Sequence, residues 1–287
     1  MKTYQQYWQS LTPLYDAGEA QAIVRTVLDV KYGMTLTDII GGKVNELSAD
    51  EGIELEKIVE RLQKAEPVQY ILGEADFAGR KFHVEPGVLI PRPETAELCG
   101  WIVENQKENA VPIPIIVDLC TGSGCIAITL NLDIPDSSVV GLDISDKAIE
   151  IATNNAKALG SEAIFRVVDV FDLLQVSKED KKTNQRADII VSNPPYICEK
   201  EKAEMEKNVL EYEPDIALFV PNENPLKFYR AIAELAFNQL RKDGMLYLEI
   251  NPLYERKMRD MLEEFGFREI ETKEDSFGKK RMMRAVK

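Results

Sequence analysis

Short apolar segments rich in β-branched residues alternate with helical patterns along the chain after residue 115. The predicted strands are residues 115–119, 139–142, 164–168, 188–191 and 245–250. Apolar residues at helical spacing lie between them, most clearly over residues 146–159 and 226–240. Strands that alternate with helices form βαβ units, so this alternation predicts an α/β fold built on a parallel sheet.

The alternation stops near the end of the chain. After a helical segment around residues 255–264, two predicted strands at 267–272 and 281–286 are joined by a loop that contains Gly278. Because no helix separates them, these consecutive strands are expected to pair antiparallel. We therefore predict a Rossmann-like sheet that is mostly parallel and has an antiparallel last strand, which a simple dinucleotide dehydrogenase does not require.

The first 74 residues show a different pattern. Two sets of apolar residues recur at helical spacing: Tyr4, Tyr7, Trp8 and Leu11 in the first, and Leu55, Ile58, Val59 and Leu62 in the second. Ser48 and Glu51 form a capping box before the second set. We predict an all-helical bundle domain over residues 1–74, a β-hairpin linker over 75–92 and an α/β domain over 93–287.

Composition narrows the possible classes of function. Lys and Arg number 35 and Asp and Glu 49, so the formal net charge is −14 and the field of the protein would repel a nucleic-acid backbone. His83 is the single histidine, which nearly excludes Ser-His-Asp catalysis and metal sites that need several imidazoles. No apolar stretch approaches the roughly 18 residues that a membrane span needs.

The cysteines and the first residues bear on the compartment of the protein. Cys99, Cys120, Cys125 and Cys198 form no C-x-x-C pair, which disfavours a zinc site, and we expect no bound metal. Residues 1–10 carry Tyr, Gln and Trp where a signal peptide would have an apolar core. Free thiols without such a leader are typical of a protein of the reducing cytoplasm.

A turn with two glycines follows the first predicted strand. In Asp118-Leu-Cys-Thr-Gly-Ser-Gly124, Gly122 and Gly124 permit a ligand to approach the backbone closely. Asp143 ends the second strand and is placed to accept hydrogen bonds from the hydroxyl pair of a ribose. Together these features predict a nucleoside site. The glycine spacing also fits the loose motif of NAD-binding proteins or a structural turn without a ligand, so it leaves the cofactor open.

The sequence Asn193-Pro194-Pro195-Tyr196 follows the fourth predicted strand, at the edge where open α/β sheets bind ligands. The prolines lack N–H donors, which leaves backbone carbonyls and the Asn193 side-chain oxygen as hydrogen-bond acceptors. Acceptors that hold both N–H bonds of a planar amino group favour a tetrahedral nitrogen as an electrophilic methyl group arrives. Tyr196 can stack on that planar group. The motif therefore predicts N-methylation of an amide or aryl amine, against the alternative of a proline-rich turn.

These two motifs resemble those of the class I methyltransferases, which use S-adenosyl-L-methionine and modify planar amino groups. Three further segments resemble the release factor glutamine methyltransferases: Pro67-Val-x-Tyr-Ile-x-Gly73, Leu89-Ile-Pro-Arg-Pro-Glu-Thr95 and Glu213-Pro-x-Ile-Ala-Leu218. The resemblance covers nearly the whole chain. It implies methylation of the side-chain amide nitrogen of glutamine in the Gly-Gly-Gln motif of peptide chain release factors, which act in translation termination, with the helical domain gripping the factor.

The resemblance also implies roles for individual residues. Asn193 and the Pro194 carbonyl would hold the glutamine amide, Tyr196 would pack on it, and Pro195 would complete this catalytic and substrate-binding motif. The residues implied at the cofactor are Cys120, Thr121, Gly122, Ser123, Gly124, Asp143, Asp169, Val170 and Asn193. Arg92 and Glu94 would lie in a loop that closes over the methyl donor, where they contact substrate or form a structural ion pair.

Three positions need separate comment. Asp169 would lie near an adenine amino group, although an acid there could equally cap a helix. Cys120 stands where the family often has a glycine, so we expect a less tight turn. Val170 stands where some members place an aromatic side chain against adenine.

Two other functions remain open. An adenine methyltransferase acting on DNA or RNA would use the same motif, but it must flip its base out of the stack and needs a positive surface, which the net charge of −14 disfavours. The other is a non-enzymatic module that binds the cofactor and regulates translation through its helical domain. We expect a monomer with no stable nucleic-acid binding and no membrane association, and a basic face on its protein partner.

Overall fold

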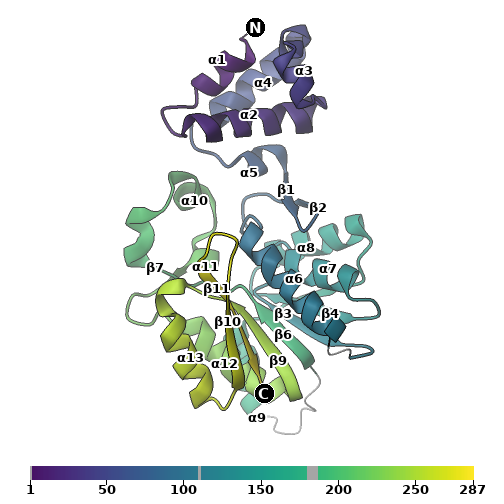
Figure 1. Cartoon of the computed structure of the whole chain (residues 1–287), viewed down its shortest axis with the longest axis vertical. Helices are drawn as coiled ribbons and strands as arrows, with labels where there is room; N and C mark the ends of the chain where they lie inside the picture. The colour runs from purple at the N-terminus through teal and green to yellow at the C-terminus, as the bar shows by residue number, and fades with distance from the viewer. Residues whose placement is uncertain (1, 109–110, 180–186) are drawn as a thin grey trace. The chain divides into compact units, whose positions relative to one another are not determined.

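The computed structural model describes residues 2–108, 111–179 and 187–287 (Figure 1). The chain divides into two units. The first contains the residues up to Glu74 together with Met205–Tyr212, and the second contains Ala75–Glu204 and Glu213–Lys287. The segment Met205–Tyr212 contacts the rest of the first unit through Tyr212, whose hydroxyl donates to the Lys64 carbonyl over 2.9 Å.

The described part of the first unit is helical. Its elements are α1 (Tyr4–Gln9), α2 (Ala17–Tyr32), α3 (Leu36–Ile40), the 3₁₀ turn η1 (Lys43–Glu46), α4 (Ala49–Leu62), α5 (Val68–Leu72) and α10 (Lys207–Tyr212). Ser48 caps α4 in a capping box with Glu51, as predicted. Tyr7, Leu11 and Leu55 of the predicted apolar faces are fully buried. Their packing stabilises helices that would be too short to persist alone.

A β-hairpin opens the second unit. β1 (Glu74–Phe77) and β2 (Arg80–His83) are joined by Ala78 and Gly79, whose φ angles of 49° and 75° are those of a tight hairpin turn. The rings of Phe77 and Phe82 pack edge to face, with centroids 5.8 Å apart. The hairpin is fastened at its end by Asn155, whose Oδ1 accepts from the backbone N–H of His83 over 2.8 Å.

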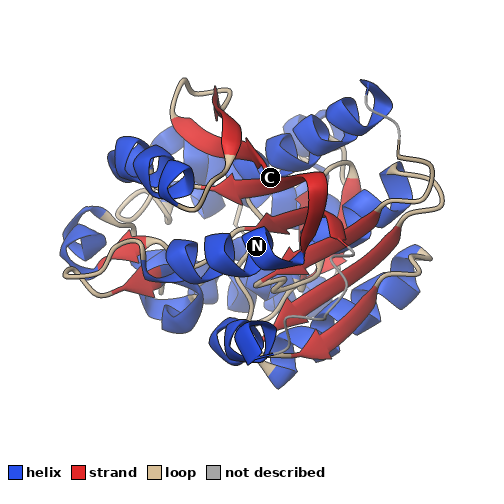
Figure 2. Cartoon of the chain, turned by 90° about the horizontal axis from the view of Figure 1, so that it is seen from below, coloured by secondary structure: helices blue, strands red, loops and turns tan. Residues whose placement is uncertain are grey.

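A seven-stranded sheet with the order β10-β11-β9-β6-β3-β4-β5 forms the centre of the described second unit (Figures 1 and 2). The strands are β3 (Ile115–Leu119), β4 (Ser138–Asp143), β5 (Ile164–Val167), β6 (Ala187–Ser192), β9 (Leu240–Glu249), β10 (Arg268–Glu274) and β11 (Lys280–Val286). Only β11 runs antiparallel, to both of its neighbours. The predicted α/β fold and the antiparallel last strand are confirmed, and β11 lies between β10 and β9 rather than at the edge.

Helices cover both faces of this sheet (Figure 2). On one face lie α6 (Pro93–Glu108), α7 (Cys125–Asp133) and α8 (Asp146–Leu159), and on the other α9 (Val170–Glu179), α12 (Lys227–Gln239) and α13 (Glu255–Glu264). The apolar cores therefore lie on either side of β6, all of whose residues are buried.

Short elements complete the second unit beyond the sheet's carboxyl edge. They are β7 (Ile197–Cys198), paired in parallel with β8 (Phe219–Val220), the 3₁₀ turns η2 (Glu199–Glu204) and η3 (Pro252–Tyr254), and α11 (Asp215–Leu218). None of the helices in the described parts of the chain is long and apolar enough to cross a membrane.

Candidate functional site

A cavity of about 320 Å³ lies at the carboxyl ends of the parallel strands. The segments that follow β3, β4, β5 and β6 form its walls, together with residues 87–89, α11 and the start of α12. The predicted site residues that line it are Cys120, Gly122, Asp143, Asp169, Val170, Asn193 and Pro195. The structure thus brings the two sequence motifs to one cavity. Thr121, Ser123, Gly124, Pro194 and Tyr196 are not among the lining residues.

The turn between β3 and α7 requires glycine for two different reasons. Gly122 has a φ angle of 54°, in the left-handed region that residues with side chains rarely adopt. Gly124 (φ 80°) also lies so close to α8 that an added Cβ would be 2.9 Å from the Ala152 Cβ. Thr121 and Ser123 are buried. The turn therefore presents mainly backbone to the cavity.

Cys120 adopts the backbone conformation of a glycine. Its φ angle of 60° is left-handed, which costs roughly 1 kcal/mol for a residue that carries a side chain. The looser turn that we expected does not form, because the backbone keeps the left-handed conformation in spite of the Cβ. Burial raises the pKa of the Cys120 thiol, which therefore stays protonated near neutral pH.

Asp143 joins the glycine turn to the end of β4. Its Oδ2 accepts from the Gly122 N–H over 2.9 Å, and its Oδ1 accepts from the Ser145 N–H over 3.0 Å. Burial raises the pKa of this carboxyl, and the backbone donors oppose that shift. A carboxylate oriented by two backbone groups at the cavity wall suits the hydroxyl pair of a ribose, and that assignment stays a prediction.

Asp118, which begins the motif, has a structural position that the sequence did not indicate. Its buried Oδ2 accepts from the Thr121 hydroxyl over 2.5 Å and from the Ala127 N–H over 3.2 Å. Its Oδ1 has no hydrogen-bond partner among the described residues. Burial raises the pKa of Asp118 to about 7. This carboxyl therefore connects β3, the turn and the start of α7 inside the core.

The wall beyond Asp143 is apolar and aromatic. Val170 is buried at the start of α9, and the rings of Phe171 and Phe228 lie beside it in the cavity wall, with centroids 5.3 Å apart. The Asp169 Oδ1 accepts from the Phe171 N–H over 2.7 Å, so this side chain caps α9. Asp169 thus has the capping contact that the sequence left as an alternative, and its contact with an adenine stays a prediction.

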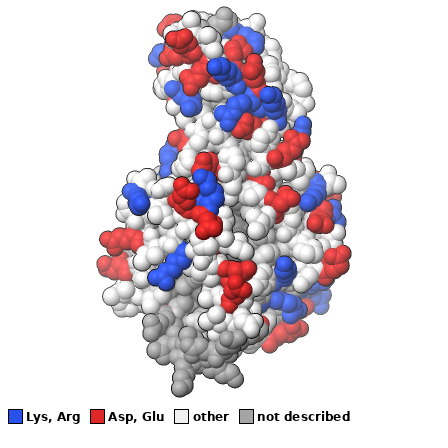
Figure 3. Space-filling model, turned by 180° about the vertical axis from the view of Figure 1, so that it is seen from behind, with Lys and Arg blue, Asp and Glu red and all other residues white. Residues whose placement is uncertain are grey.

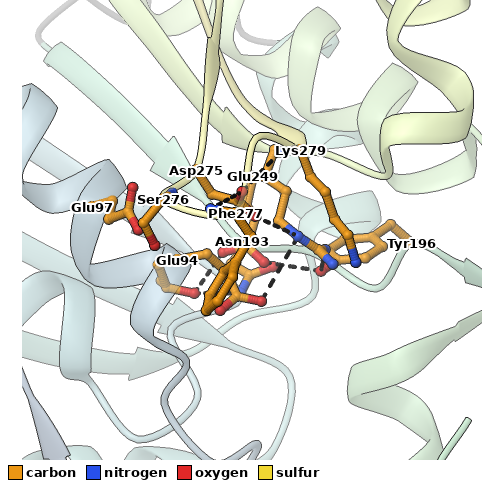
Figure 4. Close-up of polar contacts among 11 residues, drawn as sticks. Glu94, Glu97, Asn193, Tyr196, Glu249, Asp275, Ser276, Phe277 and Lys279 are labelled. Atoms are coloured by element: carbon orange, nitrogen blue, oxygen red, sulfur yellow. Dashed lines mark hydrogen bonds and ion pairs between the residues drawn. The ribbon is translucent and has the colours of Figure 1, made fainter.

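The Asn193-Pro194-Pro195-Tyr196 motif leaves the end of β6 at the cavity. The Asn193 Nδ2 donates to the Thr95 hydroxyl over 3.2 Å, which leaves Oδ1 as the free acceptor of that amide. The Tyr196 hydroxyl donates to the Glu249 Oε1 over 2.9 Å, and burial raises the pKa of this phenol. Figure 4 shows Asn193, Tyr196 and Glu249 within one cluster of polar contacts.

Thr95, Glu249 and Arg281 belong to this site: Thr95 ends a motif segment but was given no role there, and Glu249 and Arg281 lie outside the motifs. Thr95 lies in the first turn of α6, Glu249 ends β9 and Arg281 is in β11. The signal that could have found Glu249 is a carboxylate directly after the apolar strand residues 245–248, since a buried charge requires partners. Arg281 lies 3.2 Å from Asp275 and 3.8 Å from Glu94.

Arg92 and Glu94 do not pair with each other as the sequence had allowed. Arg92 pairs with Glu213, whose buried carboxylate also accepts from the Ile90 N–H over 3.2 Å, and Glu94 faces Arg281. Neither Arg92 nor Glu94 is among the residues that line the described cavity. The expected loop is also shorter, because the Arg92 carbonyl accepts from the Thr95 N–H over 3.1 Å and α6 already begins at Pro93.

The chain matches two family models. Residues 115–274 match a methyltransferase domain, and residues 14–73 match the PrmC N-terminal domain. Curated relatives extend over nearly the full length. The release factor glutamine methyltransferase of Bacteroides thetaiotaomicron is 48% identical over 277 residues, which cover 96% of both chains. That of Flavobacterium psychrophilum is 38% identical over 286 residues, which cover 99% of this chain and 98% of the relative.

Solved structures share the fold at lower identity. A 16S rRNA methyltransferase from T. Thermophilus in complex with AdoMet and guanosine has a TM-score of 0.51 and 22% identity, over 75% of this chain and 49% of that chain. The hMettl16 catalytic domain in complex with a 3'UTR hairpin has a TM-score of 0.54 and 15% identity, over 71% of this chain and 74% of that chain. The fold and the full-length relatives lead to one assignment: the chain belongs to the release factor glutamine methyltransferase family.

Proposed function

We propose that the protein transfers the methyl group of S-adenosyl-L-methionine to the side-chain amide nitrogen of glutamine in the Gly-Gly-Gln motif of peptide chain release factors. The observation that carries this proposal is the orientation of Asn193. Its Nδ2 is engaged by Thr95, so its Oδ1 is the acceptor available at the cavity that Cys120 and Asp143 also line. An acceptor beside a nucleoside site suits an N–H donor substrate.

The cavity fits the cofactor. Gly122 and Gly124 keep side chains away from the turn, Asp143 supplies a carboxylate for the ribose, and Val170 and Phe171 supply an apolar wall for the adenine. S-adenosyl-L-methionine supplies a methyl group on a positively charged sulfur, which leaves as a neutral thioether when the nitrogen attacks.

The residues of the motif would activate a poor nucleophile. An amide nitrogen is weakly nucleophilic because its lone pair is delocalised into the carbonyl. The Asn193 Oδ1 and the Pro194 carbonyl would accept the two N–H bonds and favour the tetrahedral nitrogen of the transition state. After transfer the methylated nitrogen would carry a positive charge and be strongly acidic, so it would lose one proton to water and no strong base is needed. Tyr196, whose hydroxyl is held by Glu249, would pack on the amide and align it.

The partner is proposed from charge and domain organisation. We assign the residues up to 74 as the part that grips the release factor, residues 75–92 as the linker and residues 93–287 as the catalytic part, except that Met205–Tyr212 packs in the first unit. A protein with a net charge of −14 is suited to a basic face on its partner. We further propose that it acts as a monomer in the cytoplasm.

Methylation of nucleic acid is the alternative that the charges disfavour. On the face shown in Figure 3, the basic side chains of the described residues lie among acidic ones. A duplex or single strand with its phosphates would gain little there. Radiolabelled cofactor offered with release factor, DNA or RNA in parallel would assign the substrate directly.

Asn193→Ala tests the proposed site. Because two aligned acceptors are reduced to one, we expect kcat for release factor methylation to fall at least about 100-fold. Mass spectrometry of the tryptic peptide that contains the Gly-Gly-Gln glutamine measures the product. The dissociation constant of the cofactor, measured by calorimetry, should change little. Methylation at the rate of the unsubstituted protein would contradict the assignment of Asn193.

A further inference from the structure

One hydroxyl connects the Asn193 side chain to a buried carboxylate. Glu249 is 1% exposed, and the pairing of Ser192 with Leu248 in the parallel register of β6 and β9 puts Glu249 level with Asn193. Its Oε2 accepts from the Thr95 hydroxyl over 2.5 Å. Its Oε1 accepts from the Tyr196 hydroxyl over 2.9 Å. An ionised carboxylate has no proton to donate, so both hydroxyls are the donors.

The charge on Glu249 is supported from two sides. The hydroxyls of Thr95 and Tyr196 donate to it, and the Arg281 guanidinium, which lies 3.5 Å from the Tyr196 hydroxyl, is a nearby positive charge. These groups oppose the effect of burial, which raises the pKa of the Glu249 carboxyl. A buried carboxylate with two donors and a nearby cation is a stable acceptor.

The direction of these bonds leaves one orientation for the Asn193 amide. A threonine hydroxyl has a single proton, and Thr95 gives that proton to Glu249. The Thr95 hydroxyl oxygen can therefore only accept a hydrogen bond from the Asn193 amide, whose Nδ2 lies 3.2 Å away. The donor is Nδ2, and Oδ1 is the atom left for a ligand. The reversed amide would bring Oδ1 against the Thr95 oxygen, two acceptors without a proton between them.

We propose that Thr95 and Glu249 are positioning residues that orient the Asn193 amide through a one-way relay of hydrogen bonds, so that Oδ1 faces the N–H of the target amide. The inference rests on the proposed function, because it explains how the acceptor is kept in place for an amide substrate. A reversed Asn193 would instead direct its own N–H bonds at the N–H bonds of the glutamine. The relay therefore supports binding of the amide in the orientation that reacts.

Two substitutions of Thr95 distinguish the effect of its hydroxyl group from the effect of its side-chain shape. Thr95→Val keeps the shape and removes the hydroxyl, which leaves the Asn193 donor without its acceptor. Because an unpaired polar group next to the reacting amide weakens its alignment, we expect kcat to fall at least about tenfold. Thr95→Ser keeps the hydroxyl and loses a methyl group, and we expect its kcat to stay within about threefold of the unsubstituted protein.

Thr129→Val is the matched control. Thr129 is buried in α7, and its Oγ1 has no hydrogen-bond partner within the described part of the chain. The same chemical change there should leave kcat unchanged. For every variant, calorimetry with S-adenosyl-L-methionine and a urea unfolding curve report cofactor binding and folding. In Thr95→Val we expect cofactor binding to match the unsubstituted protein and the free energy of unfolding to fall, because the Glu249 Oε2 loses its donor, while the protein stays folded under assay conditions.

The order of the two Thr95 variants decides the inference. If the Thr95 hydroxyl directs the hydrogen bonds, the kcat of Thr95→Val is much lower than that of Thr95→Ser. If Thr95 only fills space, the kcat of Thr95→Ser is equal to that of Thr95→Val or lower. Serine and valine with equal kcat, or valine with the kcat of the unsubstituted protein, would overturn the relay. An unsubstituted protein that does not methylate release factor glutamine would instead overturn the proposed function, which is a distinct result.

Discussion

Two regions lie at the same edge of the sheet but are built in opposite ways: the glycine turn proposed to hold the cofactor, and the cluster around Asn193 proposed to hold the glutamine amide, which we call the amide site. The turn, Asp118–Gly124, consists of consecutive residues, and its shape comes from left-handed backbone conformations. The amide site takes Thr95 from α6, Asn193 from the end of β6, Glu249 from β9 and Arg281 from β11. A local motif can therefore specify the turn, whereas the amide site exists only when distant segments come together.

The two regions also handle buried charge differently. Asp118 beneath the turn has one oxygen without a partner in the described structure, and burial raises its pKa to about 7. Glu249 at the amide site has a hydroxyl donor on each oxygen. We expect the turn to be the region whose stability depends on pH, and the amide site to be the one whose function depends on hydrogen-bond direction.

Asp118→Asn should give the largest effect and tests the turn. The Asp118 carboxyl has its ordinary pKa of 3.8 in the unfolded chain and a pKa of about 7 in the folded protein. Between these two pH values the carboxyl is therefore protonated in the folded state and ionised in the unfolded state. The resulting stabilisation is complete below about pH 4 and is lost as pH rises through about 7. Its size is about 4 kcal/mol from a shift of this magnitude. Asp118→Asn should remove this dependence.

Urea unfolding of the cofactor-free protein at pH 5 and pH 8 measures about 3 kcal/mol of this change, since the remainder falls below pH 5. A Trp8→Phe background leaves Trp101, which packs against Tyr247 in the second unit, as the single tryptophan reporter. Asp136→Asn replaces an exposed carboxyl and should keep the pH dependence. An equal pH dependence in Asp118→Asn and in the unsubstituted protein would show that the carboxyl is not responsible.

Glu213→Gln should give an intermediate effect and tests contacts between distant segments. The Glu213 carboxylate is buried and pairs with Arg92 just before the helix that carries Thr95. Glu213→Gln leaves the Arg92 charge without its partner. We therefore expect a loss of about 1–3 kcal/mol in the free energy of unfolding.

The matched control for that change is Glu104→Gln. Glu104 lies 3.8 Å from Lys273 on the surface, and such exposed pairs contribute about 0–1 kcal/mol. Urea unfolding of both variants gives the comparison. If Glu213→Gln lost no more stability than Glu104→Gln, the contact between the two segments would not be what holds them.

Cys120→Gly should give the smallest effect and probes the strain in the turn. At a φ of 60° a glycine avoids the penalty of a side chain, so we expect the free energy of unfolding to rise by up to about 1 kcal/mol. The same replacement at Cys125, in the first turn of α7, should lower it, because glycine is unfavourable in a helix and a buried side chain is lost. A loss of stability in Cys120→Gly would mean that thiol packing outweighs the strain.

Much of the fold and part of the site could be predicted from the sequence. Alternating strand and helix patterns predicted the parallel sheet, and the missing helix before residues 281–286 predicted the antiparallel last strand. Gly122 and Asp143 line one cavity because a glycine turn and the end of the next strand are neighbours in any such sheet, and their contact with a cofactor stays a prediction. These features depend on periodicity and backbone conformation, which act over a few residues.

The wrong expectations concern contacts that backbone patterns do not encode. Arg92 and Glu94 lie close in sequence, yet each pairs with a residue brought by another segment. The helix that includes Thr95 began earlier than expected because proline is favourable in a first turn. Cys120 kept a glycine-like conformation because its neighbours on both sides are held by strand and turn hydrogen bonds.

The sequence by itself determined the class of fold, the glycine turn and the position of the Asn-Pro-Pro-Tyr motif at a strand end. Only the tertiary structure decided that Glu249 lies level with Asn193, because the register of β9 against β6 sets that level. It also decided which atom of the Asn193 amide is free, since that depends on the proton that Thr95 gives to Glu249. Hydrogen-bond direction follows from the complete set of neighbours, and those neighbours come from segments that the sequence keeps far apart.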